Sequence, residues 1–242
     1  MIVLPIFLQM TLEYNAMQAG LSLAPLSLSM FAVALLASRK TGKRRASSIV
    51  GIGFALTTVG LLLIIPLVPR ADFGWWLAGP LLLAGSGLGL LVSQLNNYTL
   101  APIEEERVSE AAGVNSAAGS FGLSFGLAVA GGIMLAALSL SFTTKTEASD
   151  VVPPGQQEQI AQVLEEDAQV LSNTQLDALL DEQPEDVSAE ILRINSEARD
   201  VSLQIALLVP VLASLLGLLN SFRMRRLPDI APSASLEGTA LG

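Results

Sequence analysis

The stretch ASSIVGIGFALTTVGLLLIIPLV, residues 46–68, decides the fold of this chain, because it contains no Asp, Glu, Lys or Arg. A bilayer core of about 30 Å requires about 20 apolar residues in a helix that rises about 1.5 Å per residue. An uncharged run of this length is typical of a helix in lipid and is rare in the core of a soluble domain. We therefore predict that this stretch spans a membrane.

Four further stretches are long enough to cross a bilayer and equally free of charge. They are Met17–Ser38, Gly74–Gln94, Val114–Phe142 and Val201–Phe222. A shorter apolar stretch, Met1–Leu12, would cover only about 18 Å as a helix. We expect it to be the remaining end of a span that begins upstream of Met1, and a short anchor at the membrane surface is the alternative. The sequence therefore predicts an all-α membrane protein.

The composition excludes most other classes of protein. The chain of 242 residues is 51% hydrophobic and 14% charged, against about 25% charged residues in soluble domains. It contains no Cys and no His, so thiolate nucleophiles, cysteine metal sites and imidazole bases are all absent. We predict that the chain is not an enzyme and holds no metal or cofactor. Its net charge of −9 also opposes binding to nucleic acid.

The positions of the cations predict the orientation in the membrane. Five cations lie between the second and third apolar stretches: Arg39, Lys40, Lys43, Arg44 and Arg45, with Gly42 among them. Cytoplasmic loops of membrane proteins carry an excess of Lys and Arg. We therefore expect this basic loop to be cytoplasmic, with both termini on the same side of the plasma membrane in a multi-pass protein.

The apolar stretches and the acidic residues together divide the chain into four regions. Residues 1–142 are predicted to hold the first five helices, residues 201–222 the last span, and residues 223–242 a cytoplasmic tail. Residues 143–200 between them contain 14 of the 22 acids and are predicted to form an acidic, helical loop outside the cell. Its apolar residues recur at helical spacing, and Pro184 is expected to begin a helix that runs into the last span. This loop is either a solvated cap or a domain that binds a partner.

Two glutamines and two sets of glycines are candidate functional residues. Gln9 and Gln94 lie near span ends, where each could line a cavity or form hydrogen bonds between helices. The motif Gly85-Ser86-Gly87-Leu88-Gly89 lies inside an uncharged span and follows no strand, which favours close helix packing over a nucleotide loop. Gly122 and Gly126 have the GxxxG spacing, which favours packing within a bundle or a dimer face.

The order of these motifs resembles one known family. Residues 4–9 and 16–26 resemble the start of the C-terminal six-helix half of major facilitator superfamily transporters, with the fourteen-span drug:proton antiporters as the nearest group. The loop around Gly42 is similar to the loop that joins the second and third helices of each half. Residues 85–89 and 102–126 resemble the fourth and fifth helices. Two positions depart from the family pattern, since Arg39 replaces an Asp and Gly119 replaces an Arg.

The resemblance implies a six-helix half-bundle of a major facilitator fold whose first helix is truncated. It implies a function as the C-terminal part of a proton-coupled multidrug-type efflux transporter, incomplete alone. Its partners would be the lipid bilayer, protons, small amphiphilic substrates and a missing N-terminal half. Gln9 and Gln94 would then line the substrate cavity, and the basic loop would contribute to the inner gate. The alternative is a non-transporting membrane module that acts in binding or assembly through its outer loop.

Overall fold

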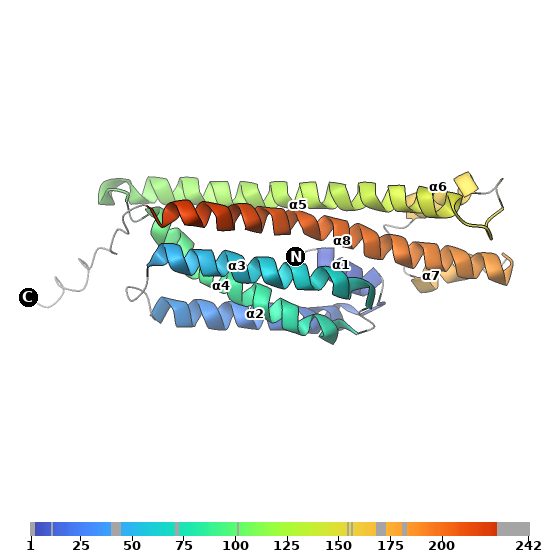
Figure 1. Cartoon of the computed structure of the whole chain (residues 1–242), viewed down its shortest axis with the longest axis horizontal. Helices are drawn as coiled ribbons and strands as arrows, with labels where there is room; N and C mark the ends of the chain where they lie inside the picture. The colour runs from blue at the N-terminus through green and yellow to red at the C-terminus, as the bar shows by residue number, and fades with distance from the viewer. Residues whose placement is uncertain are drawn as a thin grey trace, which may run out of the picture. The chain divides into compact units, whose positions relative to one another are not determined.

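The computed structural model describes residues 3–10, 12–39, 45–70, 73–100, 102–153, 155, 157–167, 173–180 and 183–226. Every regular element in these ranges is helical, which confirms the prediction of an all-α chain (Figure 1). The α-helices are α1 (Val3–Met10), α2 (Ala16–Arg39), α3 (Ala46–Ile64), α4 (Ala78–Leu100), α5 (Val108–Glu147), α6 (Gln157–Asp167), α7 (Asn173–Leu179) and α8 (Glu185–Met224). Three short 3-10 helices complete the order: η1 (Ile65–Arg70), η2 (Gly74–Leu77) and η3 (Glu105–Arg107).

Five of these helical segments are long and apolar enough to cross a membrane. They are Ala16–Ala37, Ala46–Arg70, Gly74–Leu100, Glu105–Glu147 and Glu185–Met224. Four of them contain a predicted stretch in full, and Ala16–Ala37 covers all of Met17–Ser38 except its last residue, so the prediction of five long apolar helices is confirmed. Helix α1 has eight residues and is too short to cross alone. Helices α5 and α8 have 40 residues each and continue into the acidic region predicted as a loop.

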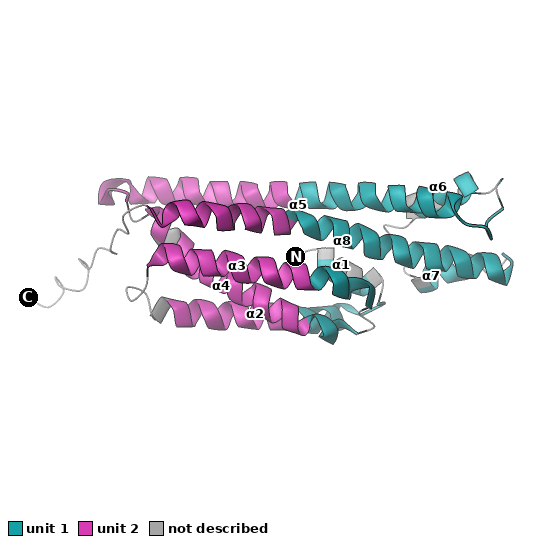
Figure 2. Ribbon diagram, viewed as in Figure 1, with its two compact units in different colours: residues 1–23, 64–77, 127–209 teal, residues 24–63, 78–126, 210–242 magenta. Residues whose placement is uncertain are grey.

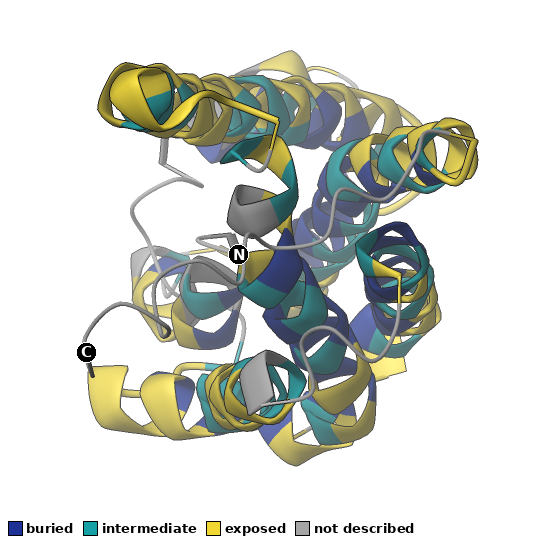
Figure 3. Ribbon diagram, turned by 90° about the vertical axis from the view of Figure 1, so that its left-hand side faces the viewer, coloured by how far each residue is buried: buried dark blue, intermediate teal, exposed yellow. Residues whose placement is uncertain are grey.

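The chain forms two compact units, shown in different colours in Figure 2. Unit 1 comprises residues 1–23, 64–77 and 127–209, and unit 2 comprises residues 24–63, 78–126 and 210–242. In both units, residues buried against neighbouring helices alternate with residues exposed on the opposite helix faces (Figure 3). Exposed apolar side chains are numerous on the five long helices, as expected for surfaces that face lipid.

Unit 1 has an apolar core formed by the far end of α5, helices α6 and α7, and the first half of α8. The core residues are Leu138, Phe142, Leu164, Leu176, Val187, Ile191, Ile194 and Ala198. Phe142 and Ile194 are fully buried in it. The start of α8 at Glu185, directly after Pro184, confirms the predicted helix start. The acidic region is therefore folded around an apolar core that it shares with Leu138 and Phe142 of α5.

Local sequence explains the helix boundaries that shape unit 1. Asn15 and Gln18 form a reciprocal capping box at the start of α2, where the Gln18 backbone N–H donates to Asn15 Oδ1 over 2.8 Å. Pro66 lacks an N–H and disfavours helical geometry at the residue before it, so α3 gives way to η1 at Ile65. The Ile65 carbonyl accepts a hydrogen bond from Gln204 Nε2 over 2.8 Å. The turn after α3 is thereby tied to α8.

Candidate functional site

The three glycines of the α4 motif allow α4 to approach two other helices of unit 2. Gly85 and Gly89 lie four residues apart and share one face of α4. A Cβ on Gly85 would lie 3.0 Å from the Leu26 carbonyl carbon of α2, and one on Gly89 would lie 3.2 Å from that of Met30. Gly87 lies on another face, where a Cβ would be 2.6 Å from the Thr57 nitrogen of α3. Each position thus places α4 against the backbone of a neighbouring helix.

Three further glycines of unit 2 make contacts that the sequence analysis did not single out. A Cβ on Gly60 of α3 would lie 2.6 Å from the Ala84 nitrogen of α4. A Cβ on Gly217 of α8 would lie 2.7 Å from Phe54 Cδ1, and one on Gly51 would lie 3.0 Å from Ser221 Oγ. Gly60 and Gly217 have no other glycine within four residues, and Gly51 has only Gly53, so no longer glycine motif marked them.

A pair of buried hydroxyl groups joins α3 to α8. Thr58 Oγ1 and Ser214 Oγ lie 2.8 Å apart, and both also approach the Phe54 carbonyl, at 2.8 Å and 3.1 Å. Hydrogen bonds between membrane helices contribute about 0.6 kcal/mol on average. In the sequence, the only sign of this contact is that Thr58 and Ser214 each lie in the middle of an apolar stretch. The pair stabilises the helix packing and carries no charge.

The two candidate glutamines lie in different units. Gln9 in α1 is exposed, and its Nε2 donates a hydrogen bond to the Pro5 carbonyl of the same helix over 3.1 Å. Gln94 in α4 is 2% exposed and has a bonding partner. A role for either in lining a cavity stays a prediction.

Most of the basic loop lies outside the described residues. Lys40, Gly42, Lys43 and Arg44 are not described, and Arg39 is the last residue of α2. Arg45 is exposed, and its carbonyl accepts the Ser48 and Ile49 N–H groups at 3.0 and 3.3 Å, which begins α3. A gating role for this loop stays a prediction.

Gly122 and Gly126 of α5 have surroundings unlike those of the α4 motif. A Cβ on either would meet no heavy atom of the described residues within 4 Å. The large side chains nearby are also exposed, with Phe121 at 70% and Leu123 at 74%. This part of α5 therefore presents a surface of small and apolar residues.

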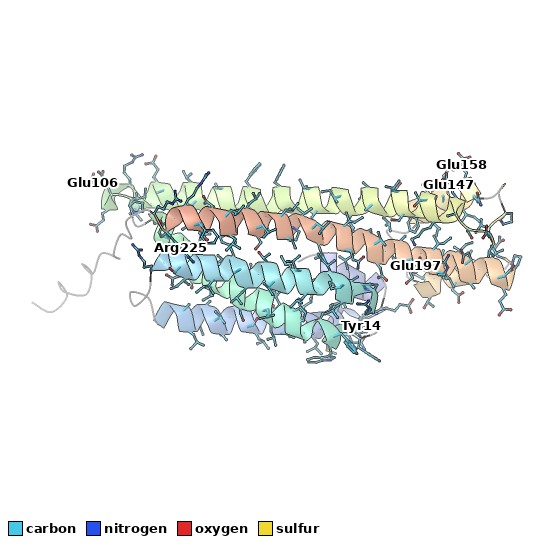
Figure 4. All side chains as sticks on the ribbon, in the orientation of Figure 1. Tyr14, Glu106, Glu147, Glu158, Glu197 and Arg225 are labelled. Atoms are coloured by element: carbon cyan, nitrogen blue, oxygen red, sulfur yellow. The ribbon has the colours of Figure 1, made fainter. Side chains whose placement is uncertain are left out.

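Outside the apolar part of α8, a group of charged side chains joins α8 to α5 in unit 1. Arg193 binds Glu190 through two nitrogens, at 2.7 and 2.8 Å, and Glu197 at 2.7 Å. Lys145 Nζ of α5 binds the other oxygen of Glu197 at 2.5 Å; Glu197 is labelled in Figure 4. The hydrogen bond from Lys145 is the main cause that lowers the pKa of Glu197. Glu197 therefore stays ionised between two cations.

The arrangement permits packing and polar contact but no acid–base chemistry within the apolar stretches. None of the five stretches contains an ionisable Asp, Glu, Lys or Arg, and such residues usually mark proton pathways in membranes. Among the described residues, no group of three or more His, Cys, Asp or Glu side chains could hold a metal ion. The functional surfaces left to consider are helix faces, the glutamines and the charged end of α8.

Comparison with known proteins places these features in one family. A sequence model of the Major Facilitator Superfamily matches residues 1–127. The "Probable actinorhodin transporter" of Streptomyces coelicolor is 24% identical over 149 residues, which cover 60% of this chain and 26% of that protein. The "Multidrug resistance protein Stp" of Mycobacterium tuberculosis is 28% identical over 158 residues, which cover 65% of this chain and 29% of that protein.

The matched region of the chain spans less than a third of the length of either relative. No solved structure matches the chain significantly. Both relatives are named for transport or drug resistance, which agrees with the prediction that this chain is not an enzyme.

Proposed function

The chain belongs to the major facilitator superfamily, and on this premise we propose that it is the C-terminal part of a proton-coupled multidrug-type efflux transporter. It is a multi-pass membrane protein, with five helical segments long and apolar enough to cross a bilayer. The observation that carries the proposal is its similarity to a probable actinorhodin transporter and to a multidrug resistance protein. The matched region covers less than a third of either relative. We therefore propose that this chain acts together with the other half of a transporter.

We propose that protons are coupled elsewhere in the intact transporter. The apolar stretches of this chain offer no carboxylate that could bind and release a proton. What this part contributes is then a packed half-bundle, in which glycines and hydroxyl groups hold α2, α3, α4 and α8 together. In such transporters two halves rock against each other around a cavity at the middle of the membrane.

We propose small amphiphilic compounds as the substrates. Uncharged helices with scattered hydroxyl and amide groups suit ligands that combine apolar area with a few polar atoms. Gln94, which is buried near the end of α4, remains the preferred polar contact from this part of the protein. Gln9 is the second candidate.

The function is tested by substrate uptake into proteoliposomes under an imposed pH gradient. One preparation contains this chain alone, and the other contains it with the product of the reading frame directly upstream of its own. We expect uptake of dye-like amphiphiles only in the second preparation, and collapse of the gradient with an ionophore should abolish it. Failure of both preparations with all such compounds would refute the exporter. Uptake by the chain alone would instead refute its dependence on another half.

We propose that the basic loop and both termini face the cytoplasm. The chain contains no Cys, so one introduced thiol reports one position. Gly42→Cys should react with a membrane-impermeant maleimide only in inverted vesicles, and Gly155→Cys should react in intact cells. The reverse pattern would overturn the orientation, and equal labelling on one side would overturn the crossing between them.

We propose that the acidic region acts as a solvated cap rather than as a partner-binding domain. Its large apolar side chains, such as Leu164 and Leu176, are buried in the core of unit 1 and are not available to another protein. Most of the acids whose exposure is described lie on exposed surface, for example Asp177 and Glu185. This arrangement favours a soluble cover over a docking face.

A further inference from the structure

We propose that Phe73, Trp75 and Trp76 form an interfacial anchor, which binds the headgroup region of the phospholipid bilayer. These three aromatic side chains are 63%, 69% and 60% exposed. Large aromatic residues are normally buried in a folded chain, so three exposed ones within four residues indicate a surface that meets something other than water. The inference concerns the membrane contact and does not depend on the proposed substrate or on proton coupling.

The position of this aromatic anchor in the chain favours lipid as its occupant. Phe73 directly precedes η2, and η2 leads directly into α4, while α3 ends in η1 a few residues earlier. Both α3 and α4 belong to segments that can cross a membrane. The anchor therefore lies, in the order of the chain, at the connection between two helical segments that are long and apolar enough to cross a membrane. Trp is enriched at the membrane–water interface because its ring is apolar and its N–H is polar.

The backbone at Gly74 fixes the direction of the aromatic side chains. The Gly74 N–H donates to the Tyr14 hydroxyl group over 3.0 Å (Tyr14 is labelled in Figure 4). A Cβ on Gly74 would lie 2.8 Å from Ser22 Cβ, so only glycine fits against α2 at this position. The turn is closed by a hydrogen bond from the Trp76 N–H to the Phe73 carbonyl over 3.1 Å.

The same turn separates an inner side from an outer side. Gly74 is buried, and Leu77 is 0% exposed. Trp75 and Trp76 lie between them in sequence and are turned outward. A loop that only needed to connect α3 and α4 would not require two exposed Trp side chains held by a buried glycine. The geometry is that of a turn held by buried contacts, which presents the indole rings to the surroundings.

The chain is well suited to a direct test, because it contains only two Trp residues and both lie in the anchor. The whole chain is reconstituted into nanodiscs whose phosphatidylcholine is brominated either near the headgroup or near the end of the acyl chain. Bromine quenches nearby Trp fluorescence. We expect shallow bromine to quench at least about twofold more than deep bromine, since indole rings concentrate at the interface. Aqueous acrylamide should quench less than it quenches free tryptophan.

Two other results would overturn the proposal. Strong quenching by acrylamide with none by either brominated lipid would place the rings in water. Weak quenching by all three agents would show that protein covers them. A control carries Trp75→Phe, Trp76→Phe and Leu212→Trp, because Leu212 is 60% exposed in the middle of the last apolar stretch. Deep bromine should be the stronger quencher there, which calibrates the depth scale.

Two substitutions test whether the turn positions the rings. Tyr14→Phe removes the acceptor of the Gly74 N–H, and Gly74→Ala adds the Cβ that meets Ser22. We expect both to reduce the ratio of shallow to deep quenching, with the larger change for Gly74→Ala. Ser22→Gly combined with Gly74→Ala removes the contact and should restore part of the ratio. An unchanged ratio in both single variants would refute the positioning role of the turn.

Discussion

The glycines of α4 and those of the first half of α5 belong to the same compact unit but have opposite surroundings. A Cβ on Gly85 or Gly89 would come within contact distance of the backbone of α2. A Cβ on Gly122 or Gly126 would meet no atom of the described residues within 4 Å. Both sets have small residues at helical spacing, so the spacing alone indicates only a helix face without large side chains. Only the presence of a second helix turns that surface into a close contact.

The comparison predicts opposite effects for the same substitution in the two helices. Gly85→Ala should lower the free energy of unfolding by about 2 kcal/mol, because the new methyl group forces backbone apart in a packed bundle. Gly122→Ala should leave it unchanged or raise it by up to about 1 kcal/mol, because Ala favours the helix and the methyl group has open space. Unfolding in sodium dodecyl sulfate titrations measures both. Equal losses for the two variants would remove the distinction between α4 and α5.

A second substitution distinguishes contact with a side chain from contact with a backbone. Gly217→Ala would place its Cβ 2.5 Å from Phe54 Cζ, a ring that can be exchanged for a smaller group. We expect a loss of about 1–2 kcal/mol from overpacking. Phe54→Leu in the same chain should recover part of this loss, measured by the same titration.

Gly89→Ala offers the matched comparison, because the Met30 and Ala34 atoms that its Cβ would meet are backbone atoms that no substitution removes. Failure of Phe54→Leu to recover any stability in Gly217→Ala would indicate that backbone displacement dominates at this position as well.

The sequence predicted the five crossing helices because uncharged runs of 20 residues have few other stable environments. It also identified Gly85, Gly87 and Gly89, since three glycines in five residues stand out within an apolar helix. It did not identify Gly60 or Gly217, because a single glycine gives no sign of which helix lies opposite. The Thr58–Ser214 contact was missed for the same reason, since its two residues lie 156 positions apart. Pairwise contacts of this kind depend on helix order and rotation, which local patterns do not determine.

The far end of α5 extends the comparison, because there the helix is held by charge and by apolar packing rather than by small residues. Lys145→Met removes the cation at 2.5 Å from Glu197. The two side chains are 30% and 42% exposed, so we expect a loss of only about 0.5 kcal/mol at neutral pH.

The pKa of Glu197 is lowered in the folded chain, so its stabilising contribution is present at neutral pH and is lost as the pH falls through that lowered value. Lys145→Met should therefore reduce the difference in stability between neutral and acid pH without abolishing it, because Arg193 still binds Glu197 at 2.7 Å. Lys145→Arg, which keeps the charge, should retain most of the difference, and an unchanged pH profile in Lys145→Met would show that the pair contributes nothing to holding α5 against α8.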